Sequence, residues 1–244
     1  GAAQTIAFAR MQLAFIHAEQ REWEKCLEVL APVPNPLQDD GSLTPLGFMI
    51  LSLKGRALVH TDQAEEGVRL IRTALEWGNR IDHRIFQYLP RHFLAEGLAK
   101  LGEYDQAIQA ANLAIAQASE AGNHWSVAVT QRLLAEIQTQ RSNPDWQQVE
   151  KYLIEARNTL RETRARPDLA RTYLALRRLY DRAGQIAWAV DCHFRATTIF
   201  EETGMMDELR QAQGQAAGDR KGAVVIPNLK LRGPNVGDEA VSNQ

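Results

Sequence analysis

The sequence predicts an all-α fold: a right-handed α-solenoid of about five helix pairs, followed by a C-terminal capping helix. Two observations support this prediction. Hydrophobic residues make up 45% of the 244 residues, and the helix-forming residues Ala, Leu, Gln, Glu and Arg are abundant. Small or apolar residues also recur at intervals of about 40 residues, a period that is typical of stacked helical repeats.

The clearest helix pair spans residues 94–118. Leucines at i, i+4 and i+7, beginning at Leu94 and ending at Leu101, lie on one face of a first helix. Gly102 predicts the end of this helix, because glycine adopts the left-handed C-terminal conformation without steric cost. Asp105 is expected to cap the second helix, which carries its own apolar stripe.

The same pattern recurs along the chain. The residues that align after each inter-helix turn are Cys26, Gly67, Ala107, Val149 and Ala189. Each pair has an apolar stripe that it cannot bury alone, so the pairs are expected to stack on their neighbours. The expected pairs are residues 5–30, 45–78, 81–121, 124–163 and 167–203, with a cap at 206–213, and together they form one repeat domain over residues 1–213.

Prolines mark the predicted helix boundaries. Three prolines between Pro32 and Pro36 end the first pair, because a proline inside a helix costs about 3 kcal/mol. Thr44 and Pro45 predict a helix start, with Thr as the N-cap and Pro at the first helical position. Pro167 predicts a second start of this kind.

Residues 214–244 form a tail that contains Gly and Pro and is predicted to be disordered or extended. The segment Ala223–Leu231, AVVIPNLKL, is strongly apolar. If it is not disordered, we expect it to lie extended against the solenoid or a partner.

The turn Leu-Gly-x-Tyr-x-x-Ala at residues 101–107 resembles the turn of a tetratricopeptide (TPR) repeat. The period of about 40 is longer than the usual 34 residues. The phrases LSLKGRALVHTDQAEEGVRLIRTAL, LPRHFLAEGLAKLGEYDQAI and ARPDLARTYLALRRLYDRAGQ resemble the C-terminal repeats of bacterial multi-domain ATPase/cyclase proteins and of MalT-type transcriptional activators. The resemblance covers residues 45–212. It implies a TPR-like sensor or interaction platform with no chemistry of its own, in a bacterial signalling or regulatory system.

Residues that could carry catalysis do not occur in the required patterns. The six histidines have no ligand spacing such as HExxH, and no glycine-rich phosphate-binding loop is present. Cys26 and Cys192 are expected to be separate buried thiols. We therefore predict no enzymatic activity, no catalytic residue, no metal and no cofactor. The net charge of -2 argues against nucleic acid as a binding partner. The lack of a long apolar run argues against a membrane span, and we expect the protein in the cytoplasm.

The first helices are expected to line a concave groove that binds a protein or an acidic peptide. The segment from Arg161 to Arg182 contains seven arginines and only three acidic residues. Arginine binds carboxylates with two parallel hydrogen bonds. The competing interpretation is that these charges only pair with neighbouring helices. The candidate partner-binding residues are Arg56, His60, His92, Glu96, Lys100, Arg132, Glu136, Arg171, Arg178 and Arg182.

Three other possibilities stay open at this stage. The chain could be a small-ligand-sensing domain of a transcriptional regulator or ATPase. A nucleic-acid-binding helical array is a less favoured alternative, because no basic stripe follows all the pairs. A homo-oligomer is also possible.

Overall fold

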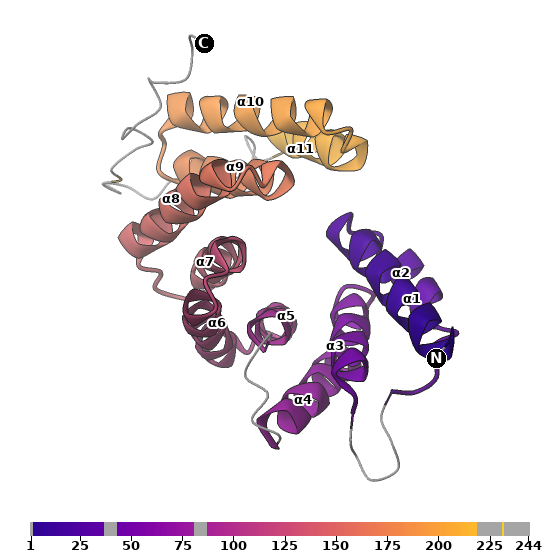
Figure 1. The fold of residues 1–244 in the computed structure, drawn as a ribbon. Coiled ribbons are helices and arrows are strands. Elements are labelled where there is room, and N and C mark those ends of the chain that lie inside the picture. The colour runs from indigo at the N-terminus through magenta and orange to yellow at the C-terminus, as the bar shows by residue number, and fades with distance from the viewer. Residues whose placement is uncertain (1, 37–42, 81–86, 219–230, 232–244) are drawn as a thin grey trace. The chain divides into compact units, whose positions relative to one another are not determined.

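The computed structural model describes residues 2–36, 43–80, 87–218 and 231. This described part of the chain contains eleven α-helices and no strand (Figure 1). The predicted all-α fold of five helix pairs with a final helix is confirmed. The helices are α1 (Ala2–Glu19), α2 (Trp23–Leu30), α3 (Pro45–Val59), α4 (Ala64–Arg80), α5 (Tyr88–Lys100), α6 (Tyr104–Glu120), α7 (His124–Gln138), α8 (Trp146–Glu162), α9 (Arg166–Arg182), α10 (Ile186–Glu202) and α11 (Met206–Gly218).

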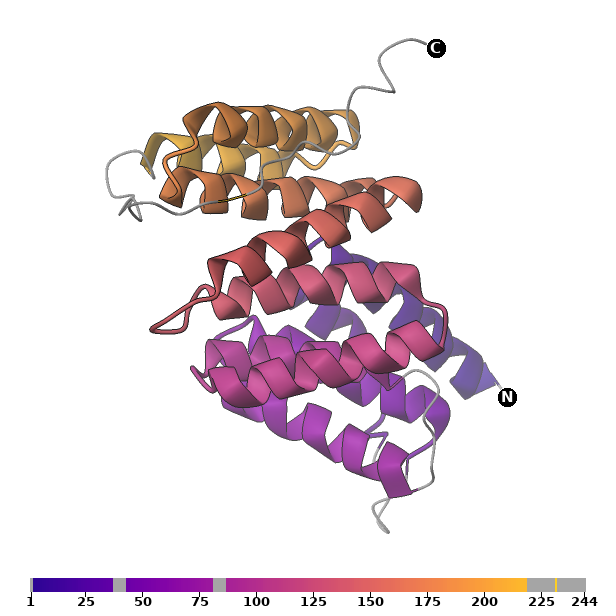
Figure 2. The same cartoon turned by 90° about the vertical axis from the view of Figure 1, so that its left-hand side faces the viewer.

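The chain divides into two compact units, residues 1–126 and 127–244. In the first unit, the first helices of successive pairs contact one another, α1 with α3 and α3 with α5, while α2, α4 and α6 each pack against the first helix of their own pair. In the second unit, α9 lies between α8 and α10, and α11 packs against α10 (Figure 2, orange to yellow).

The residues that align after each inter-helix turn are all buried. Cys26, Ala107, Val149 and Ala189 are at most 2% exposed, and Gly67 is buried. The register predicted from the 40-residue period is therefore confirmed.

The crossing of α3 and α4 requires glycine on both sides. A Cβ atom on Gly67 would lie 2.4 Å from the backbone oxygen of Gly55, and a Cβ atom on Gly55 would lie 2.8 Å from the oxygen of Gly67. Contacts below 3 Å between such atoms do not occur in folded proteins, so any other residue at either position would force the helices apart.

Tight left-handed turns connect most of the helices. Gly102 ends α5 with φ of 77°. The N–H of Glu103 donates to the oxygen of Leu98 and the N–H of Gly102 donates to the oxygen of Ala99, which together form a Schellman motif. Elsewhere Arg21, Asp62 and Arg164 adopt the same positive φ without being glycine. The structure corrects one prediction here: Glu103 occupies the N-cap position of α6, and Asp105 lies in the first turn.

Helix starts and the chain end agree with the sequence patterns in part. The Thr44 hydroxyl accepts a hydrogen bond from the N–H of Gly47 at 3.0 Å, and Pro45 is the first residue of α3. Pro167 lies in the first turn of α9. The helix α11 continues to Gly218, five residues past the expected end of the cap. Of the predicted tail beyond it, all except Leu231 lies outside the described residues.

Candidate partner-binding site

All ten predicted partner-binding residues belong to the first helices of their pairs, with His60 as the C-cap residue of α3. They fall into two groups, one in each unit. The first-unit group lies on α3 and α5 and the second-unit group on α7 and α9.

In the first unit, Arg56 is the centre of an ion-pair network. Its Nε donates to Glu96 Oε2 at 2.8 Å and its Nη2 donates to Glu96 Oε1 at 3.2 Å, so the guanidinium holds this carboxylate with two hydrogen bonds. Its Nη1 donates to Glu19 Oε1 at 3.0 Å. Arg56 on α3 therefore links the first helices of the pairs before and after it.

Aromatic rings cover the same guanidinium. The centre of the Arg56 guanidinium lies 4.5 Å from the ring centroid of Phe93 and 5.5 Å from that of Trp23, within the range of a cation–π contact. The Trp23 ring stacks on His60 with 4.0 Å between centroids and an interplanar angle of 7°. This cluster is consequently half-buried and closely packed.

Two histidines approach the carboxylate of Glu96. His92 Nε2 lies 3.4 Å from Oε1 and His60 Nε2 lies 3.6 Å from Oε2. Burial alone would raise the pKa of Glu96, but the nearby charge of Arg56 and the adjacent imidazole of His92 hold this pKa well below its usual value. Glu96 is thus a carboxylate that stays ionised inside the network.

Lys100, the last predicted residue of the first unit, is exposed at the C-terminal end of α5. The structure also adds three residues that the sequence prediction missed: Glu19, Trp23 and Phe93. Glu19 lies 37 residues before Arg56, close to the repeat period, so this spacing was the signal that could have identified it.

In the second unit, a similar network is buried. Arg171 donates to Asp168 Oδ1 and to Glu208 Oε1, both at 3.1 Å, and Arg132 Nη2 lies 3.6 Å from Asp168 Oδ1. Arg171 was expected at the surface, and this expectation is wrong: it is only 8% exposed. Glu208 on α11 contributes to this burial, because its carboxylate contacts the guanidinium in the N-terminal half of α9.

Two of the predicted arginines on α9 remain accessible. The side chain of Arg178 is 45% exposed and its Nη2 donates to Glu136 Oε1 at 2.9 Å. One turn later, the guanidinium of Arg182 lies 5.7 Å from the ring centroid of Trp146 on α8. These two residues present positive charge at the surface, whereas Arg132 and Arg171 neutralise buried acids.

The sequence left open whether these arginines bind a partner or only pair with neighbouring helices. The geometry assigns some of them to each interpretation. Arg56, Arg132 and Arg171 form ion pairs between neighbouring first helices. Arg178 and Arg182 also have partners within the protein but keep exposed surface. The accessible part of the predicted site in the second unit is therefore smaller than the sequence suggested.

The described residues were also compared with the requirements of a metal site, a reactive thiol and a membrane span. Within the described ranges, no group of three or more His, Cys, Asp or Glu side chains could hold a metal ion. Cys26 and Cys192 are both buried and free, and burial raises the pKa of the Cys26 thiol to about 11. Among the described helices, none is long and apolar enough to cross a membrane.

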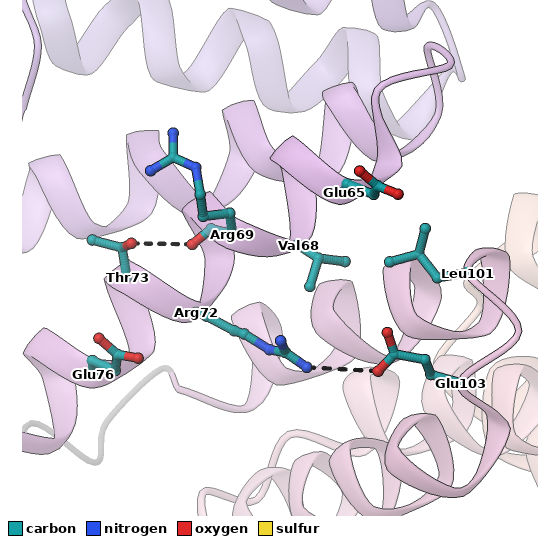
Figure 3. Close-up of a pocket in the computed structure, with 8 residues that line it drawn as sticks. All are labelled: Glu65, Val68, Arg69, Arg72, Thr73, Glu76, Leu101 and Glu103. Atoms are coloured by element: carbon teal, nitrogen blue, oxygen red, sulfur yellow. Dashed lines mark hydrogen bonds and ion pairs between the residues drawn. The ribbon is translucent and has the colours of Figure 1, made fainter.

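A cleft of about 490 Å³ lies between α4 and the turn that joins α5 to α6, away from the predicted residues (Figure 3). Its two arginines already have partners: Arg69 forms an ion pair with Glu66, and Arg72 Nη2 lies 3.8 Å from Glu103 Oε2. The cleft is lined by Glu65, Val68, Arg69, Arg72, Thr73, Glu76, Leu101 and Glu103.

Comparison with solved structures identifies the class of fold. The chain is similar to a Rap protein complexed with Competence and Sporulation Factor, with a TM-score of 0.71 and 13% identity over 84% of this chain and 57% of the Rap chain. It is also similar to BtubC from P. vanneervenii, with a TM-score of 0.61 and 16% identity over 79% of this chain and 78% of that one. A third similar structure is a Podosopora anserina putative kinesin light chain with nearly identical TPR-like repeats, with a TM-score of 0.54 and 18% identity over 80% of this chain and 95% of that one.

At these identities the matches show the fold alone. The chain has a TPR-like helical-repeat fold, and it spans little more than half of the Rap chain that it matches. No family model matches the sequence, and a search of curated proteins gives no significant match.

Proposed function

We propose that this chain is a non-enzymatic module that binds a protein or peptide partner on the first helices of its second unit, α7 and α9. The observation that carries the proposal is the pair of accessible arginines on α9. Arg178 and Arg182 are one turn apart and retain exposed surface, while Glu136 and Trp146 hold their guanidinium groups from within the protein. An acidic segment would therefore meet positive charge that is held in place by a packed network.

One of the similar structures supports the proposal of a bound partner. The Rap protein of similar fold was solved in complex with Competence and Sporulation Factor, so this fold accommodates a bound factor in that protein. By analogy, we infer a sensing or scaffolding role in a bacterial signalling or regulatory system, in the cytoplasm.

The test uses arrays of immobilised acidic peptides, with arrays of the corresponding lysine-containing peptides as a charge control. We expect the full chain to bind acidic peptides and to lose them as salt is raised, because exposed charges are screened beyond about 8 Å at physiological ionic strength. Arg178→Glu with Arg182→Glu should abolish this binding and leave the melting temperature nearly unchanged, since each exposed ion pair is worth only about 0–1 kcal/mol.

A matched control is Arg69→Glu with Arg72→Glu, which places the same charge change on α4. If both double variants retain peptide binding, or if both lose it equally, the face of α9 is not the binding surface. A large loss of stability in the α9 variant with unchanged peptide affinity would leave these arginines with a structural role only.

A small-ligand sensor is a second candidate, and one cleft in the first unit favours it. The cleft measures about 520 Å³ and has an apolar wall that includes Ile50, Leu51 and Leu70, with Lys54 and Glu66 also lining it. Apolar clefts of this size with a few polar groups are typical of small-molecule sites. Leu70→Arg, at a partly exposed position of the same wall, would obstruct this cleft without changing α9, so it separates the two candidates in any binding assay.

A further inference from the structure

The cleft of about 520 Å³ in the first unit has an apolar floor on α3. Ile50, Leu51 and Leu58 form this floor, and Leu70 on α4 belongs to one side wall. The three floor residues are at most 7% exposed, so the core holds their side chains in place. From Ile50 to Leu58 the floor extends about 12 Å along the helix, at a rise of 1.5 Å per residue.

The opposite wall of the cleft is irregular chain and not a helix. α2 ends at Leu30 after 8 residues, whereas α4, α6, α8 and α10 have 17 residues each. Leu30, Val33 and Pro36 then line the cleft. Pro36 and the two prolines before it have no N–H, and the N–H groups of Ala31 and Val33 already donate to carbonyl oxygens of α2. This wall therefore offers few backbone donors to a ligand.

These walls favour an aliphatic ligand over a peptide. The floor on α3 and the wall on α4 are helical, so their backbone groups are bonded within the helices. A peptide in the cleft would leave most of its own backbone groups without protein partners, and burying unpaired polar groups is costly. An aliphatic chain has no such groups and gains free energy from contact with the apolar lining.

Lys54 supplies a positive charge at the same cleft. It lies on α3 between Leu51 and Leu58 and is exposed. Glu66 also lines the cleft, but Arg69 holds its carboxylate with two hydrogen bonds, of 2.7 Å from Nε and 2.5 Å from Nη2. Lys54 acts on Glu66 only through its charge and forms no hydrogen bond or ion pair with another described residue. Its ammonium group is therefore available to an anionic ligand.

We propose that this cleft binds a medium-chain aliphatic carboxylate, with the alkyl chain on the α3 floor and the carboxylate at Lys54. The volume of the cleft lies within the range of small-molecule sites. This inference rests on the second candidate function, the small-ligand sensor, and is independent of partner binding on α9.

Calorimetric titration of the full chain with octanoate, decanoate and the neutral decanol tests the proposal. We expect each added methylene to tighten carboxylate binding about fourfold, because burying a methylene is worth about 0.8 kcal/mol. Lys54→Gln should weaken decanoate binding by about fivefold, the upper value for an exposed ion pair, and should leave decanol binding unchanged.

Two control variants locate the ligand. Lys151→Gln removes the same charge from an exposed position on α8 in the second unit and should leave decanoate binding unchanged. Phe194→Asp alters an exposed apolar side chain of α10 and should also have no effect. A loss of decanoate binding in either control that equals the loss in Lys54→Gln would place the ligand elsewhere and overturn the proposal.

The remaining outcomes separate the ligand class from the cleft itself. If decanol binds as tightly as decanoate, or if Lys54→Gln leaves decanoate binding unchanged, the carboxylate class is wrong although the cleft still holds a ligand. If no ligand of the series binds, or if Leu70→Arg weakens neither decanol nor decanoate, the cleft is not the binding site. The small-ligand candidate then fails with the proposal, whereas binding of acidic peptides on α9 is unaffected.

Discussion

Glu96 shows how a single residue connects the packing and the charges of the first unit. Its carboxylate accepts two hydrogen bonds from Arg56 on the neighbouring first helix and lies close to two histidines. Because the side chain is largely buried, removing its charge would leave the guanidinium of Arg56 without its main partner. Breaking one side of such a pair is more costly than the pair itself is stabilising.

We predict that Glu96→Gln lowers the free energy of unfolding at neutral pH by about 3 kcal/mol, the low end for breaking a buried ion pair. The folded pKa of Glu96 is depressed, so its stabilisation is present above the unfolded pKa and is lost as pH falls towards the folded value. The variant should therefore lose stability less steeply than the parent below about pH 5.

Urea unfolding at a series of pH values measures this effect. Glu66→Gln is the control, because Glu66 forms an exposed ion pair with Arg69 within one helix. It should change stability little at neutral pH. An unchanged acid slope in Glu96→Gln would show that another group governs the acid sensitivity.

At this scale, the sequence predicted which residues belong to the first-helix face but not which of them are accessible. The spacing placed Arg171 and Arg178 on one helix, yet it could not show that Glu208 covers the first and leaves the second exposed. Burial of a long side chain depends on the element that packs over it, and α11 begins 24 residues after the end of α9.

The turns between helices show how the elements are joined. Gly102, Gly122, Gly184 and Gly204 adopt positive φ, and Arg164 does so at an equivalent turn. A non-glycine residue in this conformation costs roughly 1–2 kcal/mol. The array therefore retains strain at the positions where glycine is missing.

We predict that Gly102→Ala destabilises the protein by about 1 kcal/mol through backbone conformation alone, because a Cβ atom there would meet nothing within 4 Å. Arg164→Gly should stabilise it by up to about 1 kcal/mol for the converse reason. Denaturant unfolding of both variants tests the pair of predictions. Changes of the same sign in both would argue against a conformational cause.

The helix crossings within pairs are expected to tolerate no added volume. Gly67→Ala and Ala107→Phe should each lower the free energy of unfolding by about 1–3 kcal/mol, because both sites lie in closely packed helix contacts. Gly214→Ala is the control: it lies within α11 with nothing within 4 Å, so it should stabilise by about 0.5–1 kcal/mol. If Ala107→Phe melts like the parent, the helices accommodate the ring.

Most of the elements could be predicted because the period, the apolar stripes and the turn residues all indicate the same helices. Gly102 and Thr44 were identified correctly, since their roles depend on local backbone chemistry. The cap of α6 was not, because Glu103 occupies that position without a side-chain hydrogen bond and so leaves no sequence signal.

For the whole molecule, two compact units each contain a charged network on their first helices. His60 stacks on Trp23 and Cys26 is buried in the core, so these side chains take part in packing. Stability should accordingly come from side-chain packing and not from a bound metal.

We predict that the purified protein contains no stoichiometric transition metal and that a chelator does not change its melting temperature. Elemental analysis and thermal melting with and without the chelator check this. A drop in melting temperature together with about one equivalent of zinc would require a metal site, since structural zinc contributes directly to folding.

The ion pairs of the first unit also favour one order of its helix pairs. Glu19, Arg56 and Glu96 come from three successive pairs, and their charges alternate in sign along the array. Repeat genes readily lose or duplicate whole units. Deletion of the second pair here would remove Arg56 and would bring the carboxylates of Glu19 and Glu96 next to each other. The alternating charges therefore favour the present order of the helix pairs and destabilise an array from which one pair has been lost.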